Sequence, residues 1–147
     1  EGVAAKIYWA ELFGPQFIRS RDGVSPNNLL NYGYTILRAA VVRAIMGSGL
    51  FPAFGIFHRN RYNAFPLADD VMEPYRPYVD EMVYNLLQQG HRQLTKDVKA
   101  ALFRILFADT RFDKAVRPLD VGLTFTSSSL AKCFAGIQKK IAYPLLE

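Results

Sequence analysis

The sequence predicts an all-α fold, a compact bundle of five to six helices. Apolar residues recur with helical spacing along most of the chain, and helix-start and helix-stop residues divide these stretches. The 147 residues suit one domain with a continuous core, and half of them are hydrophobic. No repeat, low-complexity tract or internal boundary interrupts the chain. Residues 1–147 are therefore predicted to form a single helical domain.

The first half of the chain contains the clearest helix signals. Residues 3–13 have helical periodicity and are followed by a Gly-Pro pair that should end the helix. Ser25 is placed to cap the next helix, and Pro26 suits its first position. That helix should run to about residue 46. Apolar residues surround much of it, which predicts a central, buried helix.

A loop and several shorter elements are predicted next. Residues 50–63 lack helical periodicity and should form the loop. A helix resumes near Pro66, and two later prolines should end or kink it. Further helices are predicted over residues 78–89 and from Thr95 to about residue 108, with Thr95 as the N-cap. Residues 113–126 are predicted to be irregular with a short hairpin, and a last helix should start at Ser127 or Ser128 and end before Pro144.

Composition restricts the function classes. The net charge of +5 favours a polyanionic partner but does not establish one. The single cysteine, Cys133, excludes a disulfide framework within one chain and suits a reducing, cytoplasmic compartment. No apolar run reaches the roughly 18–20 residues of a membrane span, and no signal peptide is visible, so no membrane partner is predicted. The chain begins with Glu1 and not Met, so we expect further residues upstream.

One segment combines residue types that bind divalent metals. Asp70 and Glu73 are three residues apart on a predicted helix, a spacing that places both on one face. His58 lies in the preceding loop. One imidazole and two carboxylates form a nitrogen and oxygen ligand set that suits manganese or magnesium. Taken by themselves, the carboxylates also fit a solvated surface pair, and the histidine also fits a structural role.

Arginines flank this segment. Arg59 and Arg61 follow the histidine, and Arg76 follows the acidic pair. Guanidinium groups beside a carboxylate-bound cation suit phosphoryl-transfer chemistry, because they bind phosphate oxygens in a bidentate way. The alternative is that these arginines only form ion pairs with Asp69, Asp70 and Glu73. No phosphate-binding loop, dinucleotide fingerprint or serine–histidine–aspartate pattern accompanies them.

Four spaced motifs then point to a known family. They are EG-xAA-xxYW at the start, N-xx-LNYGY-xxL, G-xxP-xxGxxH and D-xxxP-xRP. Together they cover most of the chain and resemble the CRISPR-associated endonuclease that acts as the adaptation integrase, in the form found in type II systems. The resemblance implies that this chain is the helical C-terminal catalytic domain. It also implies a β-rich N-terminal domain that this chain lacks.

The resemblance further implies a set of site residues. Glu1, His58 and Glu73 match the family's catalytic positions, which bind Mn²⁺ or Mg²⁺. Asp70 matches a further acidic position that would be a ligand or would orient one. Arg59, Arg61 and Arg76 are expected to bind DNA, a type of contact that carries little sequence information and is sensitive to salt.

The implied function is insertion of protospacer DNA into a CRISPR array by transesterification. The expected partners are protospacer DNA and the CRISPR repeat, a second copy of the full protein in a homodimer, and the small second adaptation subunit. A fragment of this kind is expected to be weak or inactive alone. Two other classes stay open on the residues: a non-catalytic, basic helical module that binds DNA or a protein, and a structural helical domain whose charged residues form surface ion pairs.

Overall fold

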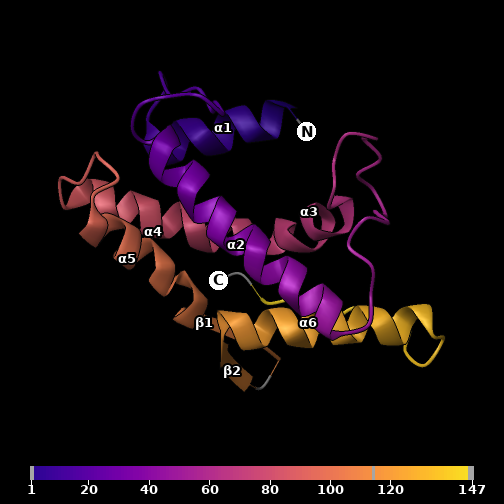
Figure 1. Cartoon of the computed structure of the whole chain (residues 1–147). Helices are drawn as coiled ribbons and strands as arrows, with labels where there is room; N and C mark the ends of the chain where they lie inside the picture. The colour runs from indigo at the N-terminus through magenta and orange to yellow at the C-terminus, as the bar shows by residue number, and fades with distance from the viewer. Residues whose placement is uncertain (1, 114, 146–147) are drawn as a thin grey trace.

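The computed structural model describes residues 2–113 and 115–145. Within them, the chain forms six α-helices, two short 3₁₀ helices and one β-hairpin (Figure 1). The elements are α1 (Gly2–Phe13), α2 (Asn27–Gly47), α3 (Pro66–Met72), η1 (Glu73–Tyr75), α4 (Arg76–Gln88), α5 (Lys96–Phe103), η2 (Arg104–Phe107), β1 (Asp109–Phe112), β2 (Ala115–Pro118) and α6 (Leu119–Phe134). The predicted all-α class is confirmed.

Helix α2 is the centre of the domain, as its sequence predicted. It runs diagonally through the molecule and contacts α3, α4, α5 and α6 (Figure 1). Its most buried side chains have no exposed surface, and they are Leu29, Leu30, Leu37, Val41 and Ile45. At Gly33, a Cβ atom would lie only 2.6 Å from Cγ1 of Val79 on α4. A glycine is therefore needed where these two helices cross.

The segment from α3 to α4 follows the predicted break. Residues 73–75 form the 3₁₀ turn η1, and α4 starts with Pro77 in its first turn. Proline suits that position because its missing N–H would have no helical partner there. Tyr75 is fully buried, and its hydroxyl is 2.7 Å from Oγ1 of Thr126 on α6. This hydrogen bond connects the break to the far side of the core.

The predicted caps have different outcomes. Thr95 caps α5, because its hydroxyl accepts a hydrogen bond from the N–H of Val98 at 3.3 Å. The predicted Ser25 cap is wrong. The N-cap residue of α2 is Pro26, and the hydroxyl of Ser25 is buried without a hydrogen-bond partner among the described residues. Residues 25–26 form a turn that precedes the helix, so the serine lies too early to cap it.

The prediction for the last helix is also wrong at its start. Helix α6 begins at Leu119, within the segment predicted to be irregular, and ends at Phe134. Gly122 suggested a loop, but it allows close packing: a Cβ there would lie 2.7 Å from Oγ1 of Thr110. The hairpin exists and lies earlier than expected, with β1 and β2 antiparallel and Thr110 opposite Arg117. No helix in the described part of the chain is long and apolar enough to cross a membrane.

Candidate metal centre

His58 is held against the bundle by the carboxylate of Asp70. The histidine lies in the loop between α2 and α3, and the aspartate lies on α3. Nδ1 of the His58 ring is 2.6 Å from Oδ1 of Asp70. The side chain of Asp70 is 10% exposed and that of His58 is 35% exposed. The structure therefore brings together two of the predicted site residues, twelve positions apart.

The same carboxylate also organises the loop backbone. The N–H groups of Ile56, Phe57 and His58 donate to Asp70 over 2.6, 3.1 and 3.1 Å. Burial by itself would raise the pKa of the Asp70 carboxyl. The hydrogen bonds from the His58 ring and from these three amides outweigh burial and lower the pKa below its ordinary value. Asp70 is therefore an ionised acceptor at neutral pH.

This arrangement selects the ring nitrogen of His58 that can bind a metal. An ionised carboxylate accepts hydrogen bonds and cannot donate them, so Nδ1 carries the proton and donates. The lone pair is then on Nε2, on the side of the ring away from Asp70. A carboxylate behind a histidine in this way fixes the ring orientation and increases the basicity of the other nitrogen. Because Asp70 already accepts four hydrogen bonds, it is better suited to orient His58 than to bind a metal itself.

Gly55 is required for this loop geometry, a role that the sequence does not reveal. A Cβ atom at Gly55 would lie 2.2 Å from the carbonyl oxygen of His58 and 2.8 Å from Cβ of Pro66. It would also lie 3.3 Å from Oδ2 of Asp70. Any side chain at this position would push the loop away from the carboxylate. The spacing of glycine three residues before histidine was visible in the sequence, but the close packing was not.

A second aspartate holds the far end of the loop. Asp69 accepts two hydrogen bonds from Arg38 on α2, at 2.8 Å from Nε and 3.1 Å from Nη2. The side-chain amide of Asn63 donates to Asp69 at 2.6 Å, and its oxygen accepts from Arg38 at 2.7 Å. Successive residues on a helix point about 100° apart, so neighbouring aspartates can hold two separate parts of the loop. Asp69 thus has a structural role close to the site.

Glu73 does not join His58 and Asp70. It lies in η1, its side chain is 52% exposed, and its Oε1 is 3.0 Å from Nε of Arg76. Nε of Arg76 nevertheless has no hydrogen-bond partner among the described residues, so this contact is an ion pair without a hydrogen bond. Among the described residues, no three His, Cys, Asp or Glu side chains form a group that could hold a metal. Glu1, the third predicted ligand, lies outside the described residues.

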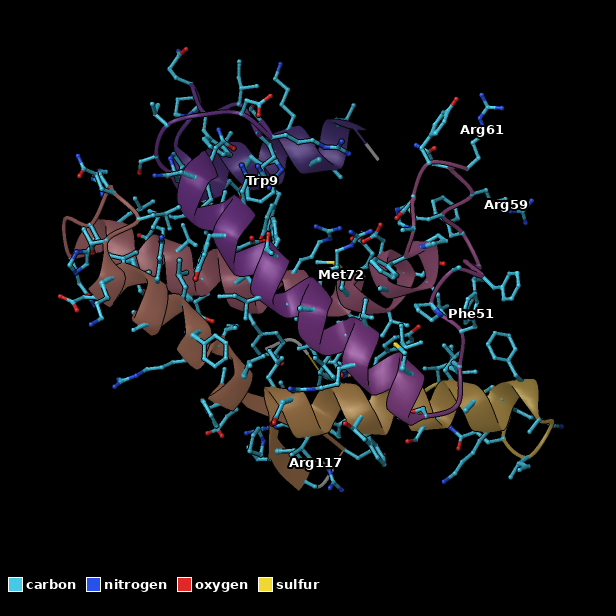
Figure 2. All side chains as sticks on the ribbon, in the orientation of Figure 1. Trp9, Phe51, Arg59, Arg61, Met72 and Arg117 are labelled. Atoms are coloured by element: carbon cyan, nitrogen blue, oxygen red, sulfur yellow. The ribbon has the colours of Figure 1, made fainter. Side chains whose placement is uncertain are left out.

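The predicted DNA-binding arginines lie in two different environments. Arg59 and Arg61 are on the exposed loop and point away from the helices (Figure 2). Neither has an ion pair among the described residues, so for these two the simple surface-pair alternative does not hold. Arg61 instead lies over the ring of Tyr62 and donates a hydrogen bond to its hydroxyl. Arg76 is half-buried and paired with Glu73, as that alternative expected.

Comparison with known proteins identifies the family. The sequence model for CRISPR associated protein Cas1 matches residues 1–115, more than half of the chain. The chain belongs to the Cas1 family. Its Cas1 relatives include the CRISPR-associated endonuclease Cas1 of Neisseria meningitidis serogroup C (strain 8013), which is 44% identical over 108 residues. That alignment covers 72% of this chain and 35% of the relative.

Two further matches cover a larger share of this chain. A CRISPR-associated endonuclease Cas1 of Pyrobaculum aerophilum is 33% identical over 139 residues, which covers 90% of this chain and 46% of the relative. A casposase bound to integration product has the same fold, with a TM-score of 0.80 and 23% identity over 95% of this chain and 47% of the casposase. The chain thus spans between a third and a half of the length of these proteins.

Proposed function

We propose that this chain is the metal-dependent catalytic domain of a DNA endonuclease and integrase, which inserts protospacer DNA into a CRISPR array. The observation that carries the proposal is the His58–Asp70 pair. It places the proton on Nδ1 and leaves Nε2 of His58 available, in a loop whose two arginines form no ion pair among the described residues. Membership of the Cas1 family supports it, because the curated relatives are named endonucleases.

The proposed metal is Mn²⁺ or Mg²⁺, with His58, Glu73 and Glu1 as ligands. The donor set fits such a cation, since Nε2 of His58 is available and the Glu73 carboxylate is half exposed. The ion pair between Glu73 and Arg76 does not prevent this, because exposed pairs contribute only about 0–1 kcal/mol. Asp70 is proposed as the residue that orients His58. When bound, the cation would stabilise negative charge on the phosphate and lower the pKa of the attacking hydroxyl.

The proposed reaction is a transesterification. The 3′-hydroxyl oxygen of the incoming strand forms a bond to a phosphorus atom of the repeat. The bond from that phosphorus to the 3′-oxygen of the repeat breaks, and the leaving oxygen takes up a proton in place of the one that the attacking hydroxyl lost. Arg59 and Arg61 would bind the phosphates of the two strands. Arg76 would bind phosphate only after it leaves Glu73.

The proposed partners follow the same reasoning. They are protospacer DNA, the CRISPR repeat, a second copy of the longer protein and the small second adaptation subunit, in the cytoplasm. The casposase with this fold was solved with its integration product, which supports DNA as the partner. Because the chain spans less than half of its relatives, we expect it to be much less active alone than within a longer protein.

A second candidate is a non-catalytic module that binds DNA. One observation favours it: the described residues bring together only two metal-binding side chains. The exposed loop carries Phe54 and Phe57 before its two arginines and Tyr62 after them, and aromatic rings beside arginines bind single-stranded DNA by stacking. This candidate needs no metal, which separates it from the first.

Calorimetric titration with Mn²⁺ tests the proposal. His58→Ala and Glu73→Ala should each weaken Mn²⁺ binding by about tenfold or more. His91→Ala is the matched control, since His91 is the other of the two histidines and is exposed. Equal Mn²⁺ affinity in all four proteins would refute the metal centre and favour the non-catalytic module. In the longer protein, retained strand transfer by the His58→Ala variant would refute the catalytic role.

A further inference from the structure

Asp80 is a buried carboxylate that forms no ion pair among the described residues. It lies on α4 and is 2% exposed. Two phenol groups donate to it: Tyr34 on α2, to Oδ1, and Tyr8 on α1, to Oδ2 at 2.7 Å. One side chain therefore connects three helices, α1, α2 and α4, through hydrogen bonds.

A carboxylate in this position is costly to the fold. Burial raises the pKa of Asp80, and the hydrogen bonds from Tyr34 and Tyr8 and the nearby charges of Arg76 and Arg19 oppose that rise only in part. A buried charge without an ion pair contributes less to stability than an apolar side chain of similar size. The contribution of Asp80 must then be to the arrangement of the helices that it connects. Buried polar groups can specify one arrangement of elements among several of similar energy.

Helix α1 is the element that most needs such specification. It has no buried residue, and its exposed side chains include Val3 and Ile7. Trp9 and Phe13 of α1 pack with Phe17 in an aromatic cluster at the end of the helix. The bond from Tyr8 is the only side-chain hydrogen bond between α1 and the rest of the described residues. Apolar packing alone does not define the direction of a helix attached mainly at one end.

Tyr34 extends the network from Asp80 to Glu73. The guanidinium carbon of Arg76 lies 5.0 Å from the centroid of the Tyr34 ring, and that of Arg19 lies 5.2 Å from it. Arg76 also pairs with Glu73 at 3.0 Å. The path from Asp80 through Tyr34 and Arg76 thus ends at a proposed metal ligand. In the view of Figure 1, α1 and α3 lie on the same side of α2.

We propose that Asp80 is a positioning residue, which fixes helix α1 through Tyr8 and the Arg76–Glu73 pair through Tyr34. The consequence for metal binding rests on the proposed function, because Glu73 and Glu1, the residue before α1, are proposed ligands. Asp80 itself touches neither metal nor DNA. Its role is to hold two separate parts of the site in one relative position.

Fluorescence of Trp9 provides a test that does not depend on activity. Trp9 is the only tryptophan in the chain, and its ring is 5.0 Å from that of Tyr8. Tyr8→Phe and Asp80→Asn should each increase quenching of Trp9 by acrylamide by about twofold, because α1 opens locally while the core stays folded. Tyr84→Phe is the matched control: Tyr84 is 38% exposed against 39% for Tyr8, and its hydroxyl has no hydrogen bond among the described residues.

Mn²⁺ titration of the same variants separates the two proposals. Both Tyr8→Phe and Asp80→Asn should bind Mn²⁺ about tenfold more weakly than the wild type at a temperature well below their unfolding midpoints. Unchanged quenching in Tyr8→Phe, which removes a single hydroxyl from a half-exposed side chain and should fold, would overturn the positioning role. Increased quenching with unchanged Mn²⁺ affinity would also overturn it. Equal Mn²⁺ affinity in the wild type and the His58→Ala variant would instead refute the proposed function. The quenching result alone would then decide the role of Asp80.

Discussion

Replacement of Asp70 by asparagine tests how the candidate centre is built. The variant keeps the size of the side chain but replaces one carboxylate oxygen by an NH₂ group, which cannot accept a hydrogen bond. In the wild type, Oδ2 accepts from the amides of Ile56 and Phe57, and Oδ1 accepts from the amide and the ring of His58. Whichever way the asparagine amide turns, two of these four donors lose their acceptor.

The expected magnitude follows from burial and charge. Hydrogen bonds to a charged group contribute about 1.5–3 kcal/mol each. The side chain of Asp70 is 10% exposed, but Ile56 and Phe57 are exposed, so their amides can turn to water. The loss should therefore be well below the sum of two full bonds, and we expect about 2–3 kcal/mol of unfolding free energy. For a domain of this size, that lowers the midpoint temperature by roughly 4–12 °C.

Metal binding should respond more strongly than stability. Without the carboxylate, the negative charge that favours the proton on Nδ1 of His58 is lost, and Mn²⁺ affinity should fall by about 10–100-fold. Calorimetry measures the affinity, and nitrogen NMR of the imidazole measures which ring nitrogen is protonated. Asp97→Asn is the control, because Asp97 is an exposed carboxylate at the start of α5. An unchanged protonation pattern together with unchanged Mn²⁺ affinity in Asp70→Asn would refute this account of the site.

Three further predictions follow from the loop and the core. Gly55→Ala should cost about 1–3 kcal/mol and abolish Mn²⁺ binding, because its Cβ would lie 2.2 Å from a loop carbonyl oxygen, whereas Gly47→Ala, with open space around it, should do neither. Calorimetry and thermal unfolding check both variants, and equal results for the two would contradict the packing argument. Arg59→Ala and Arg61→Ala should each lower the slope of log affinity against log salt by about 1 in DNA titrations, and an unchanged slope would exclude phosphate contacts. For Asp80, burial raises the pKa above its ordinary value of about 3.9, so its contribution to stability is complete below that pH and is lost as the pH rises through the raised pKa. The free energy of unfolding of the wild type, relative to Asp80→Asn, should therefore fall over that range in urea titrations, and a difference independent of pH would contradict the buried charge.

The chain also shows how far local patterns predict a fold. The central helix α2, the loop after it and the break around Pro74 were visible in the sequence, because periodicity and proline act over a few residues. The Thr95 cap was visible for the same reason. The start of α6 was not, because Gly122 and Pro118 resemble loop residues unless their packing is known.

The candidate site was likewise predicted only in part from the sequence. Its residue types were identified from the sequence: His58, Asp70, Glu73 and the arginines around them. Their pairings were not, because the helix spacing that placed Asp70 beside Glu73 ends at η1. Asp70 turns to the loop and His58, while Glu73 turns to Arg76. Glu1 and its proposed role stay a prediction.

The sequence by itself determined the helical class, the family motifs and the chemical groups of the proposed site, because these depend on residue type and short-range spacing. Only the tertiary structure decided which acid holds which partner. Asp70 and His58, Asp69 and Arg38, and Asp80 with its two tyrosines are separated by 12 to 72 residues along the chain. Each of these contacts exists because the packing of α1, α3 and α4 against α2 and the loop brings distant groups within hydrogen-bond distance and excludes the water that would otherwise satisfy them.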